Sequence, residues 1–347
     1  MNIAFILPSL ANKAPIKLIA SISNYLTLTG NLCSVFYFDN IVELQFNCKI
    51  NRISMKEKIE FDKYDIIHSN MYRPDKYLYH WRKEISNSKV VSTLHCDIFH
   101  DLYYTYKNIL FAKFFENIWI YRLKYFDKVI CISQYVENIY KNKMKNTTVI
   151  YNGVEINKTS NFDLGILNKI NKCREDGYKL ILCYAYITKR KGLVLPIQAI
   201  KDKKDYVLFI IGDGPEKKKL IRLVKLYQLT GRVFFFSQQF DPYLYLKYFD
   251  LFIMPSINEG FGLALVEAIL MGKPCICSDI EIFKELFSSL HVTFFNLENI
   301  NSLKSAIDYA YKYGLEKAEV AKEYASKYYM ANSMCKKYYE YYNYLLS

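Results

Sequence analysis

The chain has 347 residues, of which 52% are hydrophobic and 23% are charged. This length predicts about two domains, and the composition excludes a disordered or fibrous protein. The nine cysteines show no Cys-x-x-Cys spacing, and several lie inside apolar runs. They are typical of reduced thiols in the cytosol, which disfavours a disulfide scaffold or a metal site.

The formal net charge is +13, from 47 Lys and Arg against 34 Asp and Glu. It reflects either a Lys-, Asn-, Ile- and Tyr-rich genome composition or attraction to a polyanion. There is no compact basic block, zinc-finger spacing or RNP-like motif, so we do not expect nucleic-acid binding. The opening MNIAFILPSL lacks the features of a signal peptide, and no run approaches the roughly 18 apolar residues that span a bilayer. We therefore expect a cytoplasmic protein that could meet a membrane only at its surface.

Short apolar runs alternate with helical patterns through the N-terminal half. A helix is predicted over 14–28, closed by Gly30. The alternation is typical of a parallel α/β sheet, whose strands are buried on both faces. The predicted strands are 3–8, 33–38, 64–69, 89–95, 128–133 and 147–153.

A polar stretch over 154–177 predicts a connection, after which the alternation resumes. Ligands are expected at the carboxyl ends of the strands in such sheets. The predicted strands are 178–187, 205–214, 232–237, 250–256 and 273–279; the predicted helices are 192–201, 215–229, 242–249, 262–271 and about 318–347.

Aromatic and basic residues are interleaved over 101–145. Such a pattern suits the headgroup region of an anionic bilayer. An ordinary core helix with solvated lysines is the alternative. The basic residues are Lys107, Lys113, Arg122, Lys124, Lys128, Lys141, Lys143 and Lys145.

The segment 258–279, NEGFGLALVEAILMGKPCICSD, carries the most chemical information. Glycines 260 and 262 allow close backbone approach, and a helix is predicted to begin near Gly262. Its first N–H groups form an anion site, with Glu259 before it and Glu267 inside the helix. A sugar nucleotide would fit this arrangement, with its diphosphate at the helix start and its hydroxyl groups hydrogen-bonded to the two carboxylates. The residues expected in this phosphate cradle are Gly260, Phe261, Gly262 and Leu263.

PSINEGFG (255–262) and the pair Glu259 and Glu267 resemble the Pro-Ser-x-x-Glu-Gly-Phe-Gly run and the Glu-x7-Glu signature of retaining glycosyltransferases of family 4. The resemblance implies the GT-B fold, α/β with two Rossmann-like doubly wound domains facing a cleft. It implies an acceptor-binding domain over 1–157, a nucleotide-sugar-binding domain over 178–325 and a C-terminal helix over 326–347 that returns toward the first domain. Other matching segments are STLHCD (92–97), CISQYVE (131–137), VIYNGVE (149–155), IGDGPEKKKL (211–220) and 232–256.

The resemblance also implies roles for single residues. Glu259 would contact sugar hydroxyls and Glu267 the ribose. His95 would reach the sugar, although a histidine at a strand end is also an ordinary turn residue. Lys191 would grip the diphosphate. The nucleotide base would be held near Ser237 to Phe240, through backbone groups.

The sequence departs from the family pattern in two places. Tyr186 stands where an Arg that also binds diphosphate is usual, and Arg190 or Lys189 is the candidate replacement. The first loop lacks the usual glycine-rich turn. Its cleft-lining candidates on the acceptor side are Ser9, Asn12 and Lys13.

The implied reaction transfers a sugar with retention, without metal or any cofactor beyond the nucleotide-sugar donor. UDP is the favoured nucleotide carrier of the sugar, and GDP is the next. The implied acceptor is a glycan or lipid-linked molecule in bacterial surface polysaccharide or lipopolysaccharide assembly, at the inner face of the plasma membrane. Two alternatives remain: a sugar-nucleotide epimerase of the same fold, and a non-catalytic, membrane-docked subunit, which Tyr186 would favour.

Overall fold

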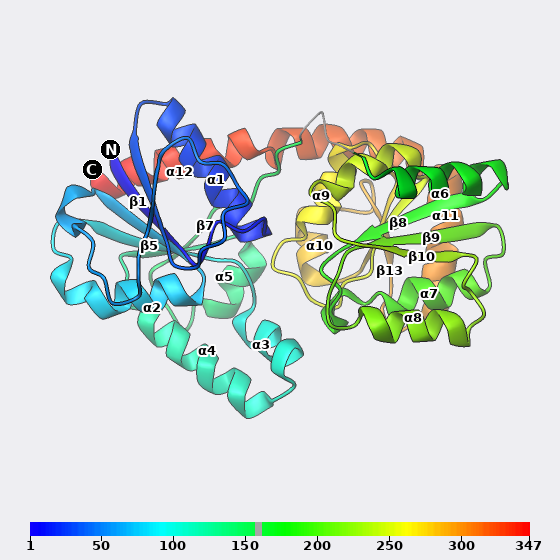
Figure 1. Cartoon of the computed structure of the whole chain (residues 1–347), viewed down its shortest axis with the longest axis horizontal. Helices are drawn as coiled ribbons and strands as arrows, with labels where there is room; N and C mark the ends of the chain where they lie inside the picture. Colours follow the sequence, from blue (N-terminus) through cyan, green and yellow to red (C-terminus); the bar gives the residue numbers. More distant parts are fainter. Residues whose placement is uncertain (157–161) are drawn as a thin grey trace. The chain divides into compact units, whose positions relative to one another are not determined.

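The computed structural model describes residues 1–156 and 162–347. The described chain forms two compact units (Figure 1). The first contains residues 1–155 and 328–347, and the second contains residues 156–327. The segment 328–347 thus completes the unit that the N-terminal half begins. The first-domain boundary expected at residue 157 lies outside the described residues.

The first unit is built on a parallel sheet of seven described strands in the order β3-β2-β1-β4-β5-β6-β7. At the centre, Ile3 of β1 lies opposite Cys33 on one side and Ile66 on the other. β4 is buried along its whole length, although only Ile66 and Ile67 of its five residues are apolar. The strands are β1 (Asn2–Leu7), β2 (Leu32–Tyr37), β3 (Lys49–Arg52), β4 (Ile66–Asn70), β5 (Lys89–Leu94), β6 (Lys128–Cys131) and β7 (Thr147–Val149).

Helices cover both faces of this sheet, with α1 and α12 on one face and α2 and α5 on the other (Figure 1). α1 occupies the predicted range, with Pro15 in its first turn and a buried stripe that includes Ile16, Ile19 and Leu26. The helices are α1 (Ala14–Leu28), α2 (Tyr72–Trp81), α3 (Ile98–Tyr106), α4 (Ile109–Leu123), α5 (Gln134–Tyr140) and α12 (Ala331–Leu346), with short 3₁₀ turns η1 (Phe61–Lys63) and η2 (Arg82–Glu84).

α12 is fastened to the first unit by backbone and side-chain bonds. The Val154 N–H donates to the Tyr329 carbonyl (2.8 Å), and the Ala331 N–H donates to the Val154 carbonyl (2.9 Å). Further along, the Tyr342 hydroxyl lies 2.5 Å from His68 Nδ1, inside the sheet–helix interface. His68 and Tyr342 are both fully buried. The helix is therefore an integral part of this core.

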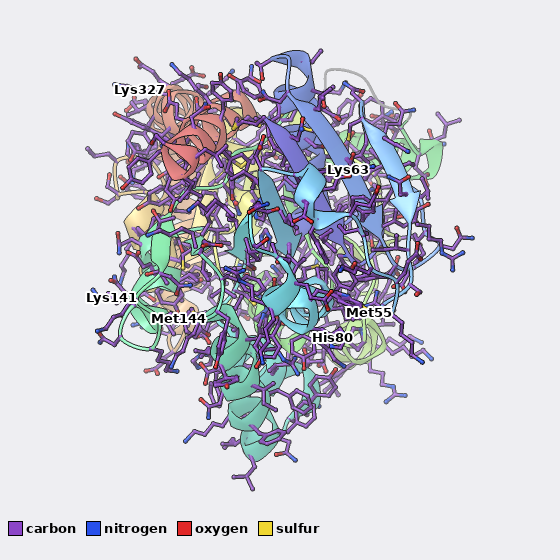
Figure 2. All side chains as sticks on the ribbon, turned by 90° about the vertical axis from the view of Figure 1, so that its left-hand side faces the viewer. Met55, Lys63, His80, Lys141, Met144 and Lys327 are labelled. Atoms are coloured by element: carbon purple, nitrogen blue, oxygen red, sulfur yellow. The ribbon has the colours of Figure 1, made fainter. Side chains whose placement is uncertain are left out.

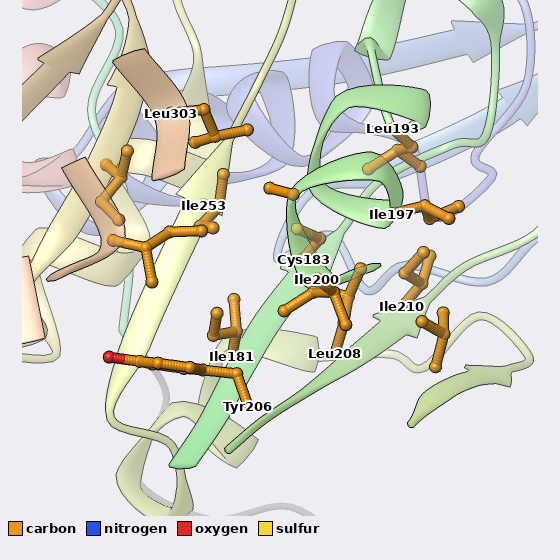
Figure 3. Close-up of a cluster of buried hydrophobic side chains, with 14 of the residues drawn as sticks. Ile181, Cys183, Leu193, Ile197, Ile200, Tyr206, Leu208, Ile210, Ile253 and Leu303 are labelled. Carbon is orange, nitrogen blue, oxygen red and sulfur yellow. The ribbon is translucent and has the colours of Figure 1, made fainter. Parts of the chain in front are cut away.

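The second unit contains another parallel sheet, with the described order β10-β9-β8-β11-β12-β13. Its order reverses between β8 and β11, as in doubly wound nucleotide-binding folds. Figure 3 shows Ile181, Ile200 and Leu208, which join β8, α7 and β9 in one core. The strands are β8 (Lys179–Tyr184), β9 (Tyr206–Ile211), β10 (Val233–Phe236), β11 (Leu251–Met254), β12 (Cys275–Ser278) and β13 (Thr293–Phe295).

The polar stretch predicted as a connection contains helix α6 (Leu164–Glu175), so that prediction was wrong there. Asp163 caps the helix, and its Oδ1 accepts from the Gly165 and Ile166 N–H groups (2.7 and 3.2 Å). The buried face is narrow, which left few apolar residues to indicate a helix. The other helices are α7 (Val194–Lys201), α8 (Lys217–Leu226), α9 (Leu263–Leu270), α10 (Glu281–Leu286) and α11 (Ile300–Tyr328), with 3₁₀ turns η3 (Lys189–Lys191) and η4 (Pro242–Tyr248).

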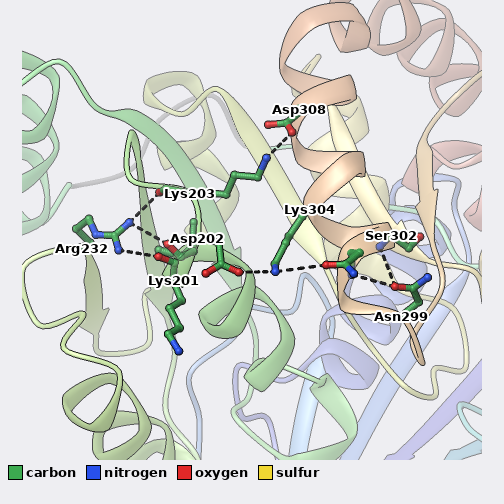
Figure 4. Close-up of polar contacts among 10 residues, drawn as sticks. Lys201, Asp202, Lys203, Arg232, Asn299, Ser302, Lys304 and Asp308 are labelled. Atoms are coloured by element: carbon green, nitrogen blue, oxygen red, sulfur yellow. Dashed lines mark hydrogen bonds and ion pairs between the residues drawn. The ribbon is translucent and has the colours of Figure 1, made fainter.

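A polar cluster joins the end of α7 to α11 and to the start of β10 (Figure 4). Arg232 Nη1 donates to the carbonyls of Ile200 and Lys203, both at 2.8 Å. Lys304 of α11 pairs with Asp202. Since these carbonyls end α7 just before β9, the cluster lies near the amino ends of β9 and β10. It stabilises the unit at the edge opposite to the predicted donor residues.

Candidate active site

The predicted donor-binding residues come from loops at one edge of the second sheet. In a parallel sheet the carboxyl ends of all strands meet at the same edge, and the loops diverge where the strand order reverses. β8 and β11 form that reversal. The loop after β8 carries Arg190 and Lys191, and the loop after β11 carries Glu259. The topology therefore brings these three residues together.

Glu259 lies at the centre of this group. Only 6% of its surface is exposed, and its Oε1 accepts from Lys191 Nζ (2.5 Å) and from the Ser256 hydroxyl (2.8 Å). Arg190 Nη1 lies 3.5 Å from the other oxygen, Oε2. Burial raises the pKa of Glu259, but the charges of Lys191 and Arg190 outweigh that effect and hold the pKa below its ordinary value. The carboxylate is therefore ionised at neutral pH.

The same two loops are also joined through their backbones. The Ile257 N–H donates to the Arg190 carbonyl (2.8 Å), and Arg190 Nη1 donates to the Asn258 carbonyl (3.2 Å). Two cations around one carboxylate leave this spot with one net positive charge. Such a group can attract and orient an anion.

Helix α9 begins beside this group. Gly262 occupies the N-cap position with φ +93°, and a Cβ there would lie 2.5 Å from Phe283 Cε1. Only glycine satisfies both conditions without strain. The helix starts one residue later than predicted, at Leu263, after the buried Phe261. Its amino end adds the positive pole of a helix dipole to the site.

Glu267 lies on α9, with its side chain partly exposed. Its Oε2 accepts from the hydroxyl of Tyr184, at 2.8 Å. Tyr184 is the last residue of β8 and was not among the predicted site residues. A tyrosine inside the apolar run LILCYAY is read as core, and nothing in the sequence pairs it with a residue 83 positions away.

The predicted base-binding segment follows β10. Ser237 is exposed, and Phe240 is 52% exposed. The N–H of Gln238, between them, donates to Asp213 Oδ2 (2.8 Å), and Asp213 Oδ1 accepts from Lys217 Nζ (2.6 Å). Asp213 follows β9, so it joins the loops after β9 and β10. The sequence analysis placed Asp213 within the predicted strand 205–214 and did not predict this contact.

Tyr186, at the position where the family arginine is expected, is 64% exposed. It lies two residues beyond the end of β8. The guanidinium group next to Glu259 comes instead from Arg190.

The remaining predicted residues lie at the carboxyl edge of the first sheet. His95 directly follows β5, and its Nε2 pairs with Asn70 Oδ1 at the end of β4. Burial lowers the pKa of His95 to about 3, so the imidazole is neutral. Ser9, Asn12 and Lys13 lie between β1 and α1.

The loop after β1 is held by two contacts that were not predicted. The Asn12 N–H donates to Glu43 Oε2 (2.7 Å). Arg73 Nη2 donates to the Pro8 carbonyl (3.1 Å) and also pairs with Asp39.

Nothing in the described residues groups three His, Cys, Asp or Glu side chains in a way that could hold a metal ion. No helix in the described ranges is long and apolar enough to cross a membrane.

Comparisons with known proteins agree with this architecture. The family models described as Glycosyl transferases group 1 and Glycosyltransferase Family 4 match residues 168–328 and 37–158. The chain is 32% identical over 331 residues to the O-antigen biosynthesis glycosyltransferase WclY of Escherichia coli, covering 90% of this chain and 89% of that protein.

Two solved structures share the fold along almost the whole chain. HepE of Anabaena, in a complex with UDP and glucose, has a TM-score of 0.80 at 19% identity, with 98% of each chain covered. Sucrose-phosphate synthase of Thermosynechococcus elongatus has a TM-score of 0.81 at 17% identity, with 99% of each covered.

The two doubly wound sheets and these likenesses define a glycosyltransferase with the GT-B fold, which confirms the predicted fold class. The chain belongs to glycosyltransferase family 4.

Proposed function

We propose that this glycosyltransferase moves a sugar, with retention of anomeric configuration, from a UDP-sugar to a glycan or lipid-linked acceptor in O-antigen or related lipopolysaccharide assembly. The observation that carries the proposal is the ionised Glu259 held by Lys191 and Arg190 beside the start of α9. The UDP and glucose bound by HepE support the choice of donor. The O-antigen role in the name of WclY supports the choice of acceptor.

In this mechanism the two cations act on the leaving group. When the bond between the anomeric carbon and the donor diphosphate breaks, negative charge builds up on the departing phosphate oxygen. Lys191, Arg190 and the amino end of α9 are fixed groups that stabilise this charge. The acceptor hydroxyl oxygen bonds to the anomeric carbon, and its proton passes to the departing phosphate. The products are the glycosylated acceptor and UDP, and no cofactor or metal takes part.

Glu259 would have two roles in this site. Its carboxylate holds Lys191 and Arg190 before the donor binds. With the diphosphate sharing those cations, the carboxylate would accept from hydroxyls of the donor sugar. His95, neutral with its Nε2 paired to Asn70, would also contact the sugar. Arg190 would replace the arginine that Tyr186 displaces.

Thermal stabilisation by UDP, GDP, ADP, CDP and dTDP tests the donor site. A ligand at 100 times its dissociation constant adds about 2.7 kcal/mol of stability. We expect UDP to stabilise the wild type and Lys189→Met, whose side chain is exposed, but not Lys191→Met or Arg190→Met. Equal stabilisation of all four proteins would refute this donor site.

A turnover assay separates the alternatives. Release of UDP that depends on an added acceptor supports transfer, and the proton coupling of the new anomeric centre reports its configuration. Sugar isomers formed without acceptor would indicate an epimerase. Nucleotide binding with no release under any acceptor would indicate a non-catalytic subunit.

We also propose that the enzyme docks on an anionic membrane through the turn between α3 and α4. These helices pack together, and α4 extends beyond the sheet of the first unit in both views (Figures 1 and 2). Leu110 is 81% exposed and Phe114 is 61% exposed. Lys107 and Lys113 stand beside them, also exposed. Apolar side chains with flanking lysines match the headgroup region of an anionic bilayer.

Two of the basic residues in the segment 101–145 are held in contacts within the first unit and are not part of this docking surface. Arg122 Nη1 donates to the Tyr72 hydroxyl (2.8 Å), and its guanidinium lies 5.2 Å from the Tyr72 ring centroid. Lys143 pairs with the buried Glu116 at 3.0 Å. These two residues stabilise the packing of α4, so variants that test docking should leave them intact.

Sedimentation with vesicles of phosphatidylcholine and phosphatidylglycerol tests the docking surface. Leu110→Ser with Phe114→Ser, and separately Lys107→Glu with Lys113→Glu, should leave the protein in the supernatant. Leu226→Ser with Lys225→Glu is the matched control, because Leu226 is 74% exposed on the second unit. Wild-type protein that does not sediment, or an equal loss in the control, would argue against this surface.

A further inference from the structure

Tyr184 and Glu267 form a hydrogen bond that has no role in the proposed transfer step. Tyr184 ends β8, with 7% of its surface exposed. Its hydroxyl lies 2.8 Å from Glu267 Oε2 and 3.0 Å from the Ala264 carbonyl oxygen. The Tyr184 ring packs against Phe252 of β11, with centroids 5.0 Å apart. The phenol is thus held by the core beneath α9 and reaches a carboxylate at the site edge.

The direction of this hydrogen bond is fixed by charge. Burial, followed by the nearby charge of Glu267, raises the pKa of Tyr184 well above its ordinary value. The phenol therefore stays protonated over the working pH range and donates. Its two possible acceptors are an anionic oxygen and a neutral carbonyl, and bonds to charged acceptors are the stronger.

The carboxylate that it holds belongs to a flexible side chain. A glutamate loses rotamer entropy when it is fixed in one conformation. Glu267 is partly exposed on α9, whereas Leu265, Val266 and Ala268 around it are buried. A donor anchored in the core keeps Glu267 in one rotamer before any ligand arrives, which reduces the ordering cost of binding.

We propose that Tyr184 is a positioning residue for the donor. It holds Glu267 in the rotamer in which the carboxylate accepts hydrogen bonds from the ribose hydroxyls of the nucleotide. This inference rests on the proposed function and on the ribose contact of Glu267 that the family resemblance implies. It adds that selection for a ribonucleotide depends on a tyrosine that does not touch the ribose. A site arranged to bind a hydroxyl discriminates against the analogue that lacks it.

Calorimetric binding of UDP and of its 2′,3′-dideoxy analogue tests the inference. The wild type should prefer UDP by about 10-fold or more, which corresponds to a hydrogen bond with a charged group. Tyr184→Phe should lose most of that preference through weaker UDP binding, with the affinity for the dideoxy analogue little changed. Glu267→Gln should lose the preference too, and Tyr184→Phe should add little in that background.

Two further variants separate positioning from general stability. Tyr338→Phe removes a buried tyrosine hydroxyl bonded to Thr93 in the first unit (3.1 Å), so it should lower stability and leave the UDP preference intact. Glu267→Asp keeps the charge but shortens the reach toward Tyr184. It should lose the preference even if Tyr184→Phe does not fold.

The outcomes distinguish this inference from the proposed function. A full UDP preference in Tyr184→Phe or Glu267→Asp, together with its loss in Glu267→Gln, would overturn the role of Tyr184 while the donor site stands. A Glu267→Gln protein with the full preference would overturn the inference while the proposed transfer stands. A wild type that binds no UDP would overturn both.

Discussion

Gly192 and Pro255 meet backbone to backbone, and a Cβ on Gly192 would stand 1.9 Å from the Pro255 carbonyl oxygen. Gly192 also has φ +62°, which disfavours any other residue. This approach sets the distance between the loop that carries Lys191 and the loop that carries Glu259. The fit of the candidate site therefore depends on a residue with no side chain.

Gly192→Ala should displace these loops and weaken UDP binding by about 10-fold or more, since an ångström of misplacement is costly in such sites. Gly177→Ala is the matched control, because Gly177 has φ +79° but a methyl group added there would meet nothing within 4 Å. The control should lose about 1 kcal/mol of stability and keep its UDP affinity. Binding by calorimetry and unfolding in urea measure the two effects, and equal UDP affinities would contradict this account.

Glu259→Gln should abolish most transferase activity and lower the free energy of unfolding by about 2 kcal/mol at neutral pH. The folded-state pKa of Glu259 lies below its ordinary value of 4.5. Its contribution to stability is therefore fully present above about pH 4.5 and is lost as pH falls through the folded-state pKa. Urea unfolding at pH 7.5 and in mild acid should show the gap to wild type narrowing.

The pair of Lys203 and Asp308, in which the Asp308 side chain is 59% exposed, supplies the control for that series. Asp308→Asn should change the free energy of unfolding by less than about 0.5 kcal/mol, because exposed ion pairs contribute little. An equal change in both variants would mean that the Glu259 pair is no more than a surface contact.

Asp75 should give the first unit an opposite dependence on pH. It is 1% exposed, and it accepts from Trp119 Nε1 (2.6 Å), Ser69 Oγ (2.6 Å) and Ser92 Oγ (2.7 Å). Burial raises the pKa of Asp75 to about 6, and the hydrogen bonds from these three donors, which lower the pKa, offset only part of that effect. Its stabilising contribution is therefore complete below pH 3.8, falls as pH rises to about 6, and is constant above that.

The stability of wild type relative to Asp75→Asn should accordingly fall by roughly 3 kcal/mol between pH 3.8 and 6, from a pKa difference of about two units. Thermal unfolding of both proteins over this range measures it. The exposed Asp62→Asn is the control on the same unit. A gap that does not vary with pH would show that the Asp75 carboxyl is not desolvated as the fold indicates.

Tyr342→Phe tests how α12 is fastened. It leaves His68 Nδ1 buried without its partner, at an expected loss of about 1–3 kcal/mol. Tyr344, on the same helix, is 71% exposed, so Tyr344→Phe should be nearly neutral. Urea unfolding followed by circular dichroism compares them. Equal stabilities would mean that packing alone holds the helix.

The strands were largely predictable because parallel strands buried on both faces consist of contiguous apolar runs. β5 and β8, for example, lie within their predicted ranges. α6 was not predicted, because only Ile166, Ile170 and Cys173 form its buried face. The segment predicted as a helix over 242–249 forms the 3₁₀ turn η4 instead. Such short elements are decided by tertiary contacts rather than by local pattern.

The candidate site was predictable where its residues lie close together in the sequence and form a recognisable motif. Glu259 and Gly262 fall in one such run. The partners Tyr184 and Asp213 were missed because the fold, not the spacing, brings them to Glu267 and to the segment after β10. Arg122 shows the reverse error: a basic residue counted toward a charged surface is in fact held against Tyr72.

The way the first unit is assembled has a consequence for biosynthesis. Its sheet is made early, but α12 follows the whole second unit in the chain. At roughly 5–20 residues per second, residues 156–327 delay the covering helix by roughly 10–30 seconds. During that interval the surface around His68 that receives Tyr342 is uncovered. The second unit, which is contiguous, can finish folding before the first, so a nascent chain exposes its N-terminal core the longest.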